Sequence, residues 1–154
     1  MPDRYAVIGN PIAHSKSPTI QAAFAASTGQ DMSYERLLAP LDGFRATVER
    51  FASDGGLGLN VTIPFKLEAF ELATETTQRA RLAGAVNTLK RIDGGWLADN
   101  TDGAGLVRDL VHNHGIVVTG QAVAILGAGG AVRGILKPLL DAGAASVAVS
   151  NRTM

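Results

Sequence analysis

The first group of residues with side chains suited to catalysis lies where a predicted strand leads into a predicted helix. Asn60, Thr62 and Lys66 lie there among apolar residues. We expect the helix to run from Pro64 to about Leu72, because the missing N–H of proline costs nothing in a first turn. Lys66 then lies in that turn, where the helix dipole slightly favours the neutral amine. A lysine that exchanges a proton suits this position. The alternative is a solvated surface lysine beside two turn formers.

Two serines precede an earlier predicted helix. Ser17 followed by Pro18 predicts an N-cap and the first residue of a helix that continues over residues 19–28 and ends at Gly29. Together with Ser15, the hydroxyls and the free N–H groups of the first turn could bind a carboxylate or a phosphate. The alternative is that one serine only caps the helix and the other only forms a turn.

Two further polar residues stand at places that structure alone could explain. Asn87 lies inside a predicted strand over residues 85–89, where it is either a bulge or edge residue or a ligand contact. Asp102 takes the N-cap position of a predicted helix that extends to Gly115, and capping would account for it fully. Nothing in the sequence resembles a cluster of metal ligands, so we expect no metal site.

The last third of the chain has the pattern of a β-α-β unit. Predicted strands over residues 122–126 and 146–150 flank a predicted helix that ends near Ala142 and should bend or shorten at Pro138. The turn before this helix is rich in glycine, and such a turn lets backbone N–H groups hold a pyrophosphate. Val132 replaces the third glycine of the usual pattern. The turn consists of Gly127, Ala128, Gly129, Gly130 and Ala131.

The residues after the second of these strands indicate which nucleotide would bind. NAD sites usually carry an acidic residue there for the ribose hydroxyls. This chain has Asn151, Arg152 and Thr153 instead. A guanidinium suits a 2′-phosphate, so the sequence favours NADP. The alternative is a surface arginine in a loop.

The remaining pattern predicts the elements that must position these residues. Asp42 is expected to cap a helix that buries Phe44, Val48 and Phe51 on one face. A hairpin turn is expected at residues 93–94. Further strands are predicted over residues 5–9, 34–38, 57–62 and 96–98, and a short helix over residues 76–82 that ends at Gly84.

Composition limits the class of protein. The 14 basic and 14 acidic residues cancel, so nucleic acid and anionic membranes are not expected partners. The absence of cysteine excludes disulfides and thiolate chemistry. With 46% apolar residues, 5% aromatic residues and 18 glycines, an α/β fold is favoured. We see no signal-peptide pattern and no run of about 18 apolar residues, and therefore expect a cytoplasmic protein.

Taken together, these motifs resemble the shikimate dehydrogenase family. The resemblance implies NADPH-dependent reduction of 3-dehydroshikimate to shikimate, on the route to aromatic amino acids, and leaves a homodimer possible. It covers the whole chain. The motifs are Ser15-Lys16-Ser17-Pro18, Asn60-Val61-Thr62-Ile63-Pro64-Phe65-Lys66, Gly84-Ala85-Val86-Asn87-Thr88, Asn100-Thr101-Asp102-Gly103, Gly127-Ala128-Gly129-Gly130-Ala131 and Asn151-Arg152-Thr153.

The resemblance also implies a role for each site residue. Lys66 and Asp102 would form the catalytic pair and also contact the substrate, and Ser15 and Ser17 would hold its carboxylate. The ring hydroxyls would be bound by Asn60, Thr62, Asn87 and Asp102. The cofactor would be bound by the glycine-rich turn over residues 127–131 and by Asn151, Arg152 and Thr153.

We therefore expect two domains. Residues 1–102 would form a substrate domain with an open mixed sheet, and residues 103–154 the first part of a Rossmann NADP-binding domain. Because a dinucleotide fold needs two halves, we expect a truncated form of a longer enzyme. Three alternatives stay open. The first is a quinate/shikimate dehydrogenase that uses NAD, and the second is a non-catalytic shikimate-binding module. The third is a methylenetetrahydrofolate dehydrogenase, which shares the general architecture, although the paired serines and the Asn-Thr-Asp-Gly stretch fit it less well.

Overall fold

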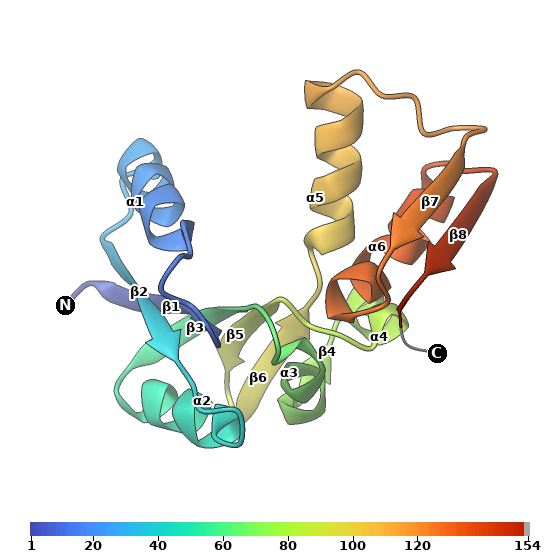
Figure 1. The fold of residues 1–154 in the computed structure, drawn as a ribbon. Helices are drawn as coiled ribbons and strands as arrows, with labels where there is room; N and C mark the ends of the chain where they lie inside the picture. Colours follow the sequence, from blue (N-terminus) through green and yellow to red (C-terminus); the bar gives the residue numbers. More distant parts are fainter. Residues whose placement is uncertain (153–154) are drawn as a thin grey trace.

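The structure is a computed structural model and describes residues 1–152. Within these residues the larger sheet has six strands in the order β2-β1-β3-β5-β6-β4 (Figure 1). Strands β1, β2 and β3 are parallel, whereas β5 runs antiparallel to both β3 and β6. The expected open mixed sheet is thus confirmed. The strands are β1 (Asp3–Gly9), β2 (Met32–Leu38), β3 (Gly56–Val61), β4 (Glu75–Thr76), β5 (Thr88–Ile92) and β6 (Gly95–Asp99).

The hydrophobic core lies between this sheet and the helices α2 (Phe44–Ser53) and α3 (Lys66–Leu72). As the sequence pattern predicts, one face of α2 is buried through Phe44, Val48 and Phe51. The ring of Phe44 stacks on that of Phe65, with 5.0 Å between the centroids. Aromatic burial of this kind holds α2 and the start of α3 against one face of the sheet.

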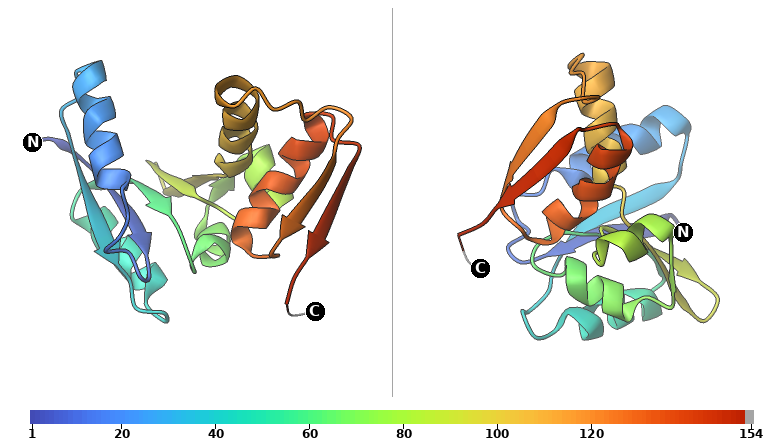
Figure 2. Two further views of the ribbon diagram at one scale, coloured as in Figure 1. Left: turned by 45° about the horizontal axis from the view of Figure 1, so that its top comes forward. Right: turned by 90° about the vertical axis from the view of Figure 1, so that its right-hand side faces the viewer.

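The opposite side of the sheet carries α1 (Ser17–Thr28), of which only Ala25 is buried. In Figures 1 and 2, α1 and α5 (Asp102–Arg108) stand apart on this side. A short helix, α4 (Gln78–Ala83), packs next to the second part of the chain. The site described below lies between α1 and α5.

The second part of the chain is the predicted β-α-β unit. Strands β7 (Ala122–Leu126) and β8 (Ser146–Ser150) pair in parallel and are joined by α6 (Gly130–Asp141). Both strands have the predicted bounds. Helix α5 continues into one π-helical turn, η1 (Asp109–Asn113), before the loop that leads to β7. The expected beginning of a Rossmann fold is confirmed in this arrangement.

Close packing between α5 and α6 joins the two parts. A Cβ atom placed on Gly103 would lie 2.3 Å from the Cγ of Pro138 and 2.4 Å from the carbonyl oxygen of Gly134. The helix was expected to bend or shorten at Pro138; α6 continues through this residue, so it is not shortened there. Because proline has no N–H, the carbonyl of Gly134 lacks its usual helical donor and faces α5 instead.

Three expected helix starts were also wrong. The helix after β3 begins at Lys66, because Pro64 belongs to a turn that the N–H of Phe65 closes on the carbonyl of Thr62 at 3.0 Å. Ser17 is the first helical residue, with Lys16 in the cap position. Asp42 does not cap α2, because Gly43 takes that position in a turn closed on Pro40.

Other expected bounds shift by a few residues. The strand expected over residues 85–89 is β5, which starts only at Thr88. Asp102 is the first residue of α5, and Thr101 takes the cap position. The negative charge of an acidic residue in the first turn interacts favourably with the helix dipole. Thr77 caps α4 by accepting a hydrogen bond from the N–H of Ala80 at 3.2 Å. The two-residue strand β4 was not predicted.

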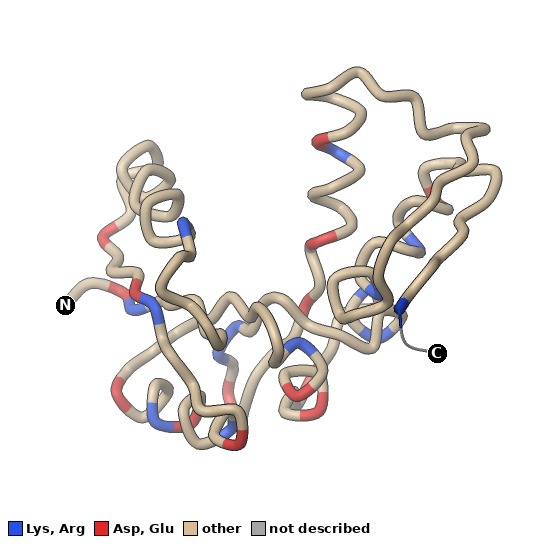
Figure 3. Tube along the Cα trace, viewed as in Figure 1, with Lys and Arg blue, Asp and Glu red and all other residues tan. Residues whose placement is uncertain are grey.

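Charged residues are scattered over the described surface, with both signs interspersed (Figure 3). No helix among the described residues has the length and apolar character that crossing a membrane would require. The same residues contain no group of three or more acidic or histidine side chains that could hold a metal ion.

Candidate active site

A cavity of about 300 Å³ opens where the strand ends meet α1, α3 and α5. Six of the seven residues expected to contact a substrate line it, and the seventh, Ser15, is hydrogen-bonded to one of them. The structure therefore brings the expected residues to one place. The cavity is lined by Val7, Ser17, Ile20, Gln21, Asn60, Val61, Thr62, Lys66, Asn87 and Asp102.

Lys66 and Asp102 form an ion pair at the cavity wall. The Nζ of Lys66, in the first turn of α3, lies 2.5 Å from the Oδ2 of Asp102, in the first turn of α5. Their side chains are 11% and 25% exposed, so the pair is sheltered from bulk water yet reachable from the cavity. A sheltered lysine ammonium that is held by a carboxylate and faces a cavity can donate a proton to a bound oxygen atom.

Asn87 holds the carboxylate of this pair in place. Its Nδ2 donates to the Oδ1 of Asp102 at 2.8 Å and to the Oγ1 of Thr101, also at 2.8 Å. Its own Oδ1 accepts from the backbone N–H of Thr101 at 3.0 Å. Asn87 precedes β5, so it is neither a bulge nor a strand residue. Both oxygen atoms of Asp102 are thereby hydrogen-bonded.

The segment before α5 is anchored by a buried amide and a salt bridge. Asn100 is 3% exposed, donates from Nδ2 to the carbonyl of Ala85 at 2.9 Å and accepts from the N–H of Asp102 at 3.1 Å. Next to it, Arg79 makes a two-point contact with Asp99. The Arg79 guanidinium is the main reason that the pKa of Asp99 is lowered from its ordinary value.

The two serines lie together at the start of α1. The Oγ atoms of Ser15 and Ser17 are 3.1 Å apart, and the N–H of Ser17 donates to the Oγ of Ser15 at 3.2 Å. The N–H of Ser17 is taken by Ser15 and Pro18 has none, so the N–H of Thr19 is the group of this first turn that stays open to an anion. Arg36, which the sequence analysis missed, binds the carbonyl of Ser15 through Nε at 2.9 Å and Nη2 at 2.6 Å.

Asn60 and Thr62 stand at the end of β3. The Oδ1 of Asn60 accepts from the hydroxyl of Tyr34 at 2.6 Å. Its Nδ2 makes weaker contacts, 3.4 Å to the Oγ1 of Thr88 and 3.5 Å to the carbonyl of Asn87. Tyr34 lies on β2, and its sequence position alone predicted no role in the site.

The glycine-rich turn lies next to the lysine. A Cβ atom on Gly130 would sit 3.2 Å from the Cβ of Lys66, a tight contact that would require the turn or Lys66 to shift slightly, so glycine eases the close approach of the turn to α3. The N–H of Gly127 donates to the carbonyl of Ser150 at 2.7 Å, which sets the turn beside the end of β8. Arg152 lies at this end and is exposed, as is Asn151, and Thr153 lies outside the described residues.

Comparison with protein families matches residues 7–89 to the shikimate dehydrogenase substrate binding domain. The NADP(+)-dependent shikimate dehydrogenase of Janthinobacterium sp. (strain Marseille) is 61% identical over 151 residues, which are 98% of this chain and 55% of that protein. The chain thus spans little more than half the length of this relative.

Solved structures give the same result for the fold. Shikimate 5-dehydrogenase from Thermus thermophilus, crystallised with NADP(H) and shikimate, is 36% identical with a TM-score of 0.88, over 98% of this chain and 56% of that one. The 5-ketofructose reductase of a Gluconobacter strain is 29% identical with a TM-score of 0.85, over 99% and 55%. The fold is therefore shared by reductases of more than one substrate.

The fold and the cavity define an α/β protein with a polar site at the ends of its strands, beside a glycine-rich β-α-β unit. The family model covers more than half of the residues. The chain belongs to the shikimate dehydrogenase family.

Proposed function

We propose that this chain acts in an NADP-dependent shikimate dehydrogenase, an enzyme that reduces 3-dehydroshikimate to shikimate. Residues 1–102 would bind the substrate, and residues 103–154 would begin the Rossmann domain for NADP. The observation that carries the proposal is the ion pair of Lys66 and Asp102 on a cavity of about 300 Å³ that polar groups line. Membership in the family supports the choice of substrate.

The polar groups are divided in a way that suits a ring with one carboxylate and several hydroxyls. The hydroxyls of Ser15 and Ser17, with the N–H of Thr19 in the first turn of α1, would bind the carboxylate. Asn60, Thr62 and Asn87 supply amide and hydroxyl groups, which can donate to and accept from ring hydroxyls. The substrate would then lie with its carboxylate toward α1 and its reacting carbon toward Lys66.

In the reduction, a hydride reaches the carbonyl carbon and negative charge develops on the oxygen. The ammonium of Lys66 would stabilise that charge and donate the proton that completes the new hydroxyl group. Asp102 holds Lys66 at 2.5 Å, and Asn87 in turn holds Asp102. Reprotonation of Lys66 would then return the site to its starting protonation state. In the oxidation of shikimate the lysine would accept the same proton.

The residues of the second unit fit the dinucleotide that would supply the hydride. No side chain caps α6, and a Cβ atom on Gly129 would meet nothing within 4 Å, so the turn is open to a pyrophosphate. Arg152, exposed after the end of β8, would bind a 2′-phosphate, together with Asn151 and Thr153. The contact of Gly130 with Lys66 would bring the cofactor toward the substrate.

The test measures shikimate binding by calorimetry and NADP-dependent oxidation of shikimate by the chain, with NAD, quinate and 5-ketofructose as comparison ligands. The variants are Lys66→Ala and, as a matched control, Lys137→Ala, which loses only an exposed pair with Asp141. Shikimate should bind to the wild type and to the control. Where turnover is seen, Lys66→Ala should reduce it by 10²-fold or more, as expected for loss of a general acid.

The other outcomes separate the alternatives. Binding without turnover would favour a shikimate-binding module, and turnover with NAD and quinate would favour a quinate/shikimate dehydrogenase. Turnover that survives in Lys66→Ala would refute the role of the lysine. Lack of binding to shikimate by the wild type, with binding to one of the comparison ligands, would refute the proposed substrate.

A further inference from the structure

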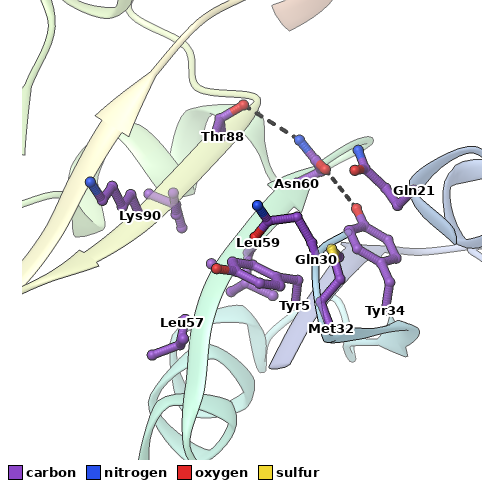
Figure 4. A pocket seen from close by; sticks show the side chains of 12 residues that line it. Tyr5, Gln21, Gln30, Met32, Tyr34, Leu57, Leu59, Asn60, Thr88 and Lys90 are labelled. Carbon is purple, nitrogen blue, oxygen red and sulfur yellow. Dashed lines mark hydrogen bonds between the residues drawn. The ribbon is translucent and has the colours of Figure 1, made fainter. Parts of the chain in front are cut away.

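Tyr34 stands behind Asn60 and outside the cavity proposed for the substrate. It lines a neighbouring cavity of about 280 Å³ on the open side of the sheet, and Asn60 lines both cavities (Figure 4). The figure shows the hydroxyl of Tyr34 directed at the side-chain oxygen of Asn60, with the amide nitrogen turned toward Thr88. The tyrosine is therefore linked to the substrate cavity by its hydrogen bond to Asn60.

The amide of an asparagine has two different ends. The oxygen accepts hydrogen bonds and the NH₂ group donates them, so the direction of the amide decides what a ligand meets. At 2.6 Å, the bond from Tyr34 to Oδ1 is the shortest that Asn60 makes; the contacts of Nδ2 measure 3.4 and 3.5 Å. The tyrosine is thus the main restraint on the direction of this amide.

The hydroxyl of Tyr34 keeps its proton. Burial raises the pKa of Tyr34 by more than the neighbouring Ser17 side chain lowers it, so the phenol stays protonated well above neutral pH. Its proton is donated to the Oδ1 of Asn60. The phenol can therefore act as a steady donor to Oδ1.

We propose that Tyr34 is a positioning residue of the active site, which fixes the side-chain amide of Asn60 so that its NH₂ group is presented to a hydroxyl of the bound substrate. The inference rests on the proposed function for the identity of that substrate. It adds a residue on β2, outside the substrate cavity, to those that determine affinity. Without the phenol hydroxyl, the Oδ1 of Asn60 would lose its strongest partner and the amide could turn over.

The main test replaces the hydroxyl alone. In Tyr34→Phe the ring still fills its space, and shikimate affinity, measured by calorimetry, should fall about tenfold. Tyr5→Phe is the matched control, because Tyr5 lines the same neighbouring cavity and makes no side-chain hydrogen bond to the described residues. Equal affinities for shikimate in the two variants would refute the proposal. Urea unfolding of both variants shows whether either change acts through stability.

A double-mutant cycle shows whether the tyrosine acts through the asparagine. In an Asn60→Ala background, Tyr34→Phe should change shikimate affinity by less than twofold, because the group that it positions is gone. A second loss of about tenfold in that background would overturn the proposal, since the tyrosine would then act by another route.

A measurement without ligand separates this inference from the proposed function. The side-chain NH₂ signals of Asn60 in a ¹⁵N–¹H spectrum, assigned by their absence in Asn60→Ala, should move in Tyr34→Phe and stay in place in Tyr5→Phe. Unmoved signals in Tyr34→Phe would refute the positioning role. If the wild type fails to bind shikimate, the proposed function is refuted. The NMR measurement needs no shikimate, so it still tests whether Tyr34 fixes the amide of Asn60.

Discussion

Two glycines of α5, two residues apart, should respond to the same substitution with opposite signs. Gly105 is exposed and a Cβ atom there would meet nothing within 4 Å, so Gly105→Ala should stabilise the chain by about 0.5–1 kcal/mol, the usual difference in helix propensity. Gly103 is buried, and a Cβ atom there would lie 2.4 Å from the carbonyl oxygen of Gly134 and 2.3 Å from the ring of Pro138.

The clash at Gly103 cannot be relieved by turning a side chain, because both neighbours are backbone or a closed ring on α6. Separation of the two helices would be needed, and overpacking of this kind typically costs about 1–3 kcal/mol. After the gain in helix propensity is subtracted, Gly103→Ala should destabilise by about 0.5–2 kcal/mol. The two variants should therefore differ by about 1–3 kcal/mol in the free energy of unfolding.

Urea unfolding followed by circular dichroism measures this difference. Thermal unfolding of the same samples gives an independent ranking, and Gly105→Ala is the control for the change in helix propensity. If Gly103→Ala proved as stable as Gly105→Ala, the close approach of α5 to α6 would be refuted, and with it the view that this contact joins the two parts of the chain.

Two further predictions concern residues around the site. Asp99→Asn should destabilise the chain by up to about 1 kcal/mol at pH 7, because its partner Arg79 is half exposed. The pKa of Asp99 is lowered on folding, so this stabilisation is present above about pH 4 and is lost as the pH falls through the lowered pKa. In urea unfolding from pH 7 to pH 2, the free energies of unfolding of the wild type and Asp99→Asn should therefore converge. A difference that stays constant over this range would contradict the prediction. Arg36→Met should weaken shikimate binding several-fold by freeing the carbonyl of Ser15, whereas Arg45→Met, at an exposed pair, should leave the calorimetric affinity unchanged.

Elements with a strong local pattern were predicted well, and those that depend on neighbours were not. The second unit has strands at the predicted residues because continuous apolar runs between glycines leave few alternatives. The strand expected over residues 85–89 starts later, since Ala85 and Val86 are fully buried by packing and not by pairing in the sheet. An apolar run can pack without sheet pairing, as at Ala85 and Val86, and only the tertiary structure decides whether it forms a strand.

The candidate site divides in the same way. Side chains with an unusual position in the sequence, such as Lys66 and Asp102, could be singled out from the sequence and assigned from the family resemblance. Tyr34 and Arg36 could not, because alternate residues of a half-buried strand look alike until the register is known. The parallel pairing of β2 with β1, and of β1 with β3, brings Tyr34 within reach of Asn60.

Asn100 shows why the site and the junction of the two parts cannot be varied independently. Its side chain binds the carbonyl of Ala85 on one side and the N–H of Asp102 on the other, and a Cβ atom on Gly134 would lie 2.6 Å from its Oδ1. The residue that sets the start of α5 is thus also the surface on which α6 packs. A displacement of α6 would therefore press on Asn100 and move Asp102 relative to Lys66.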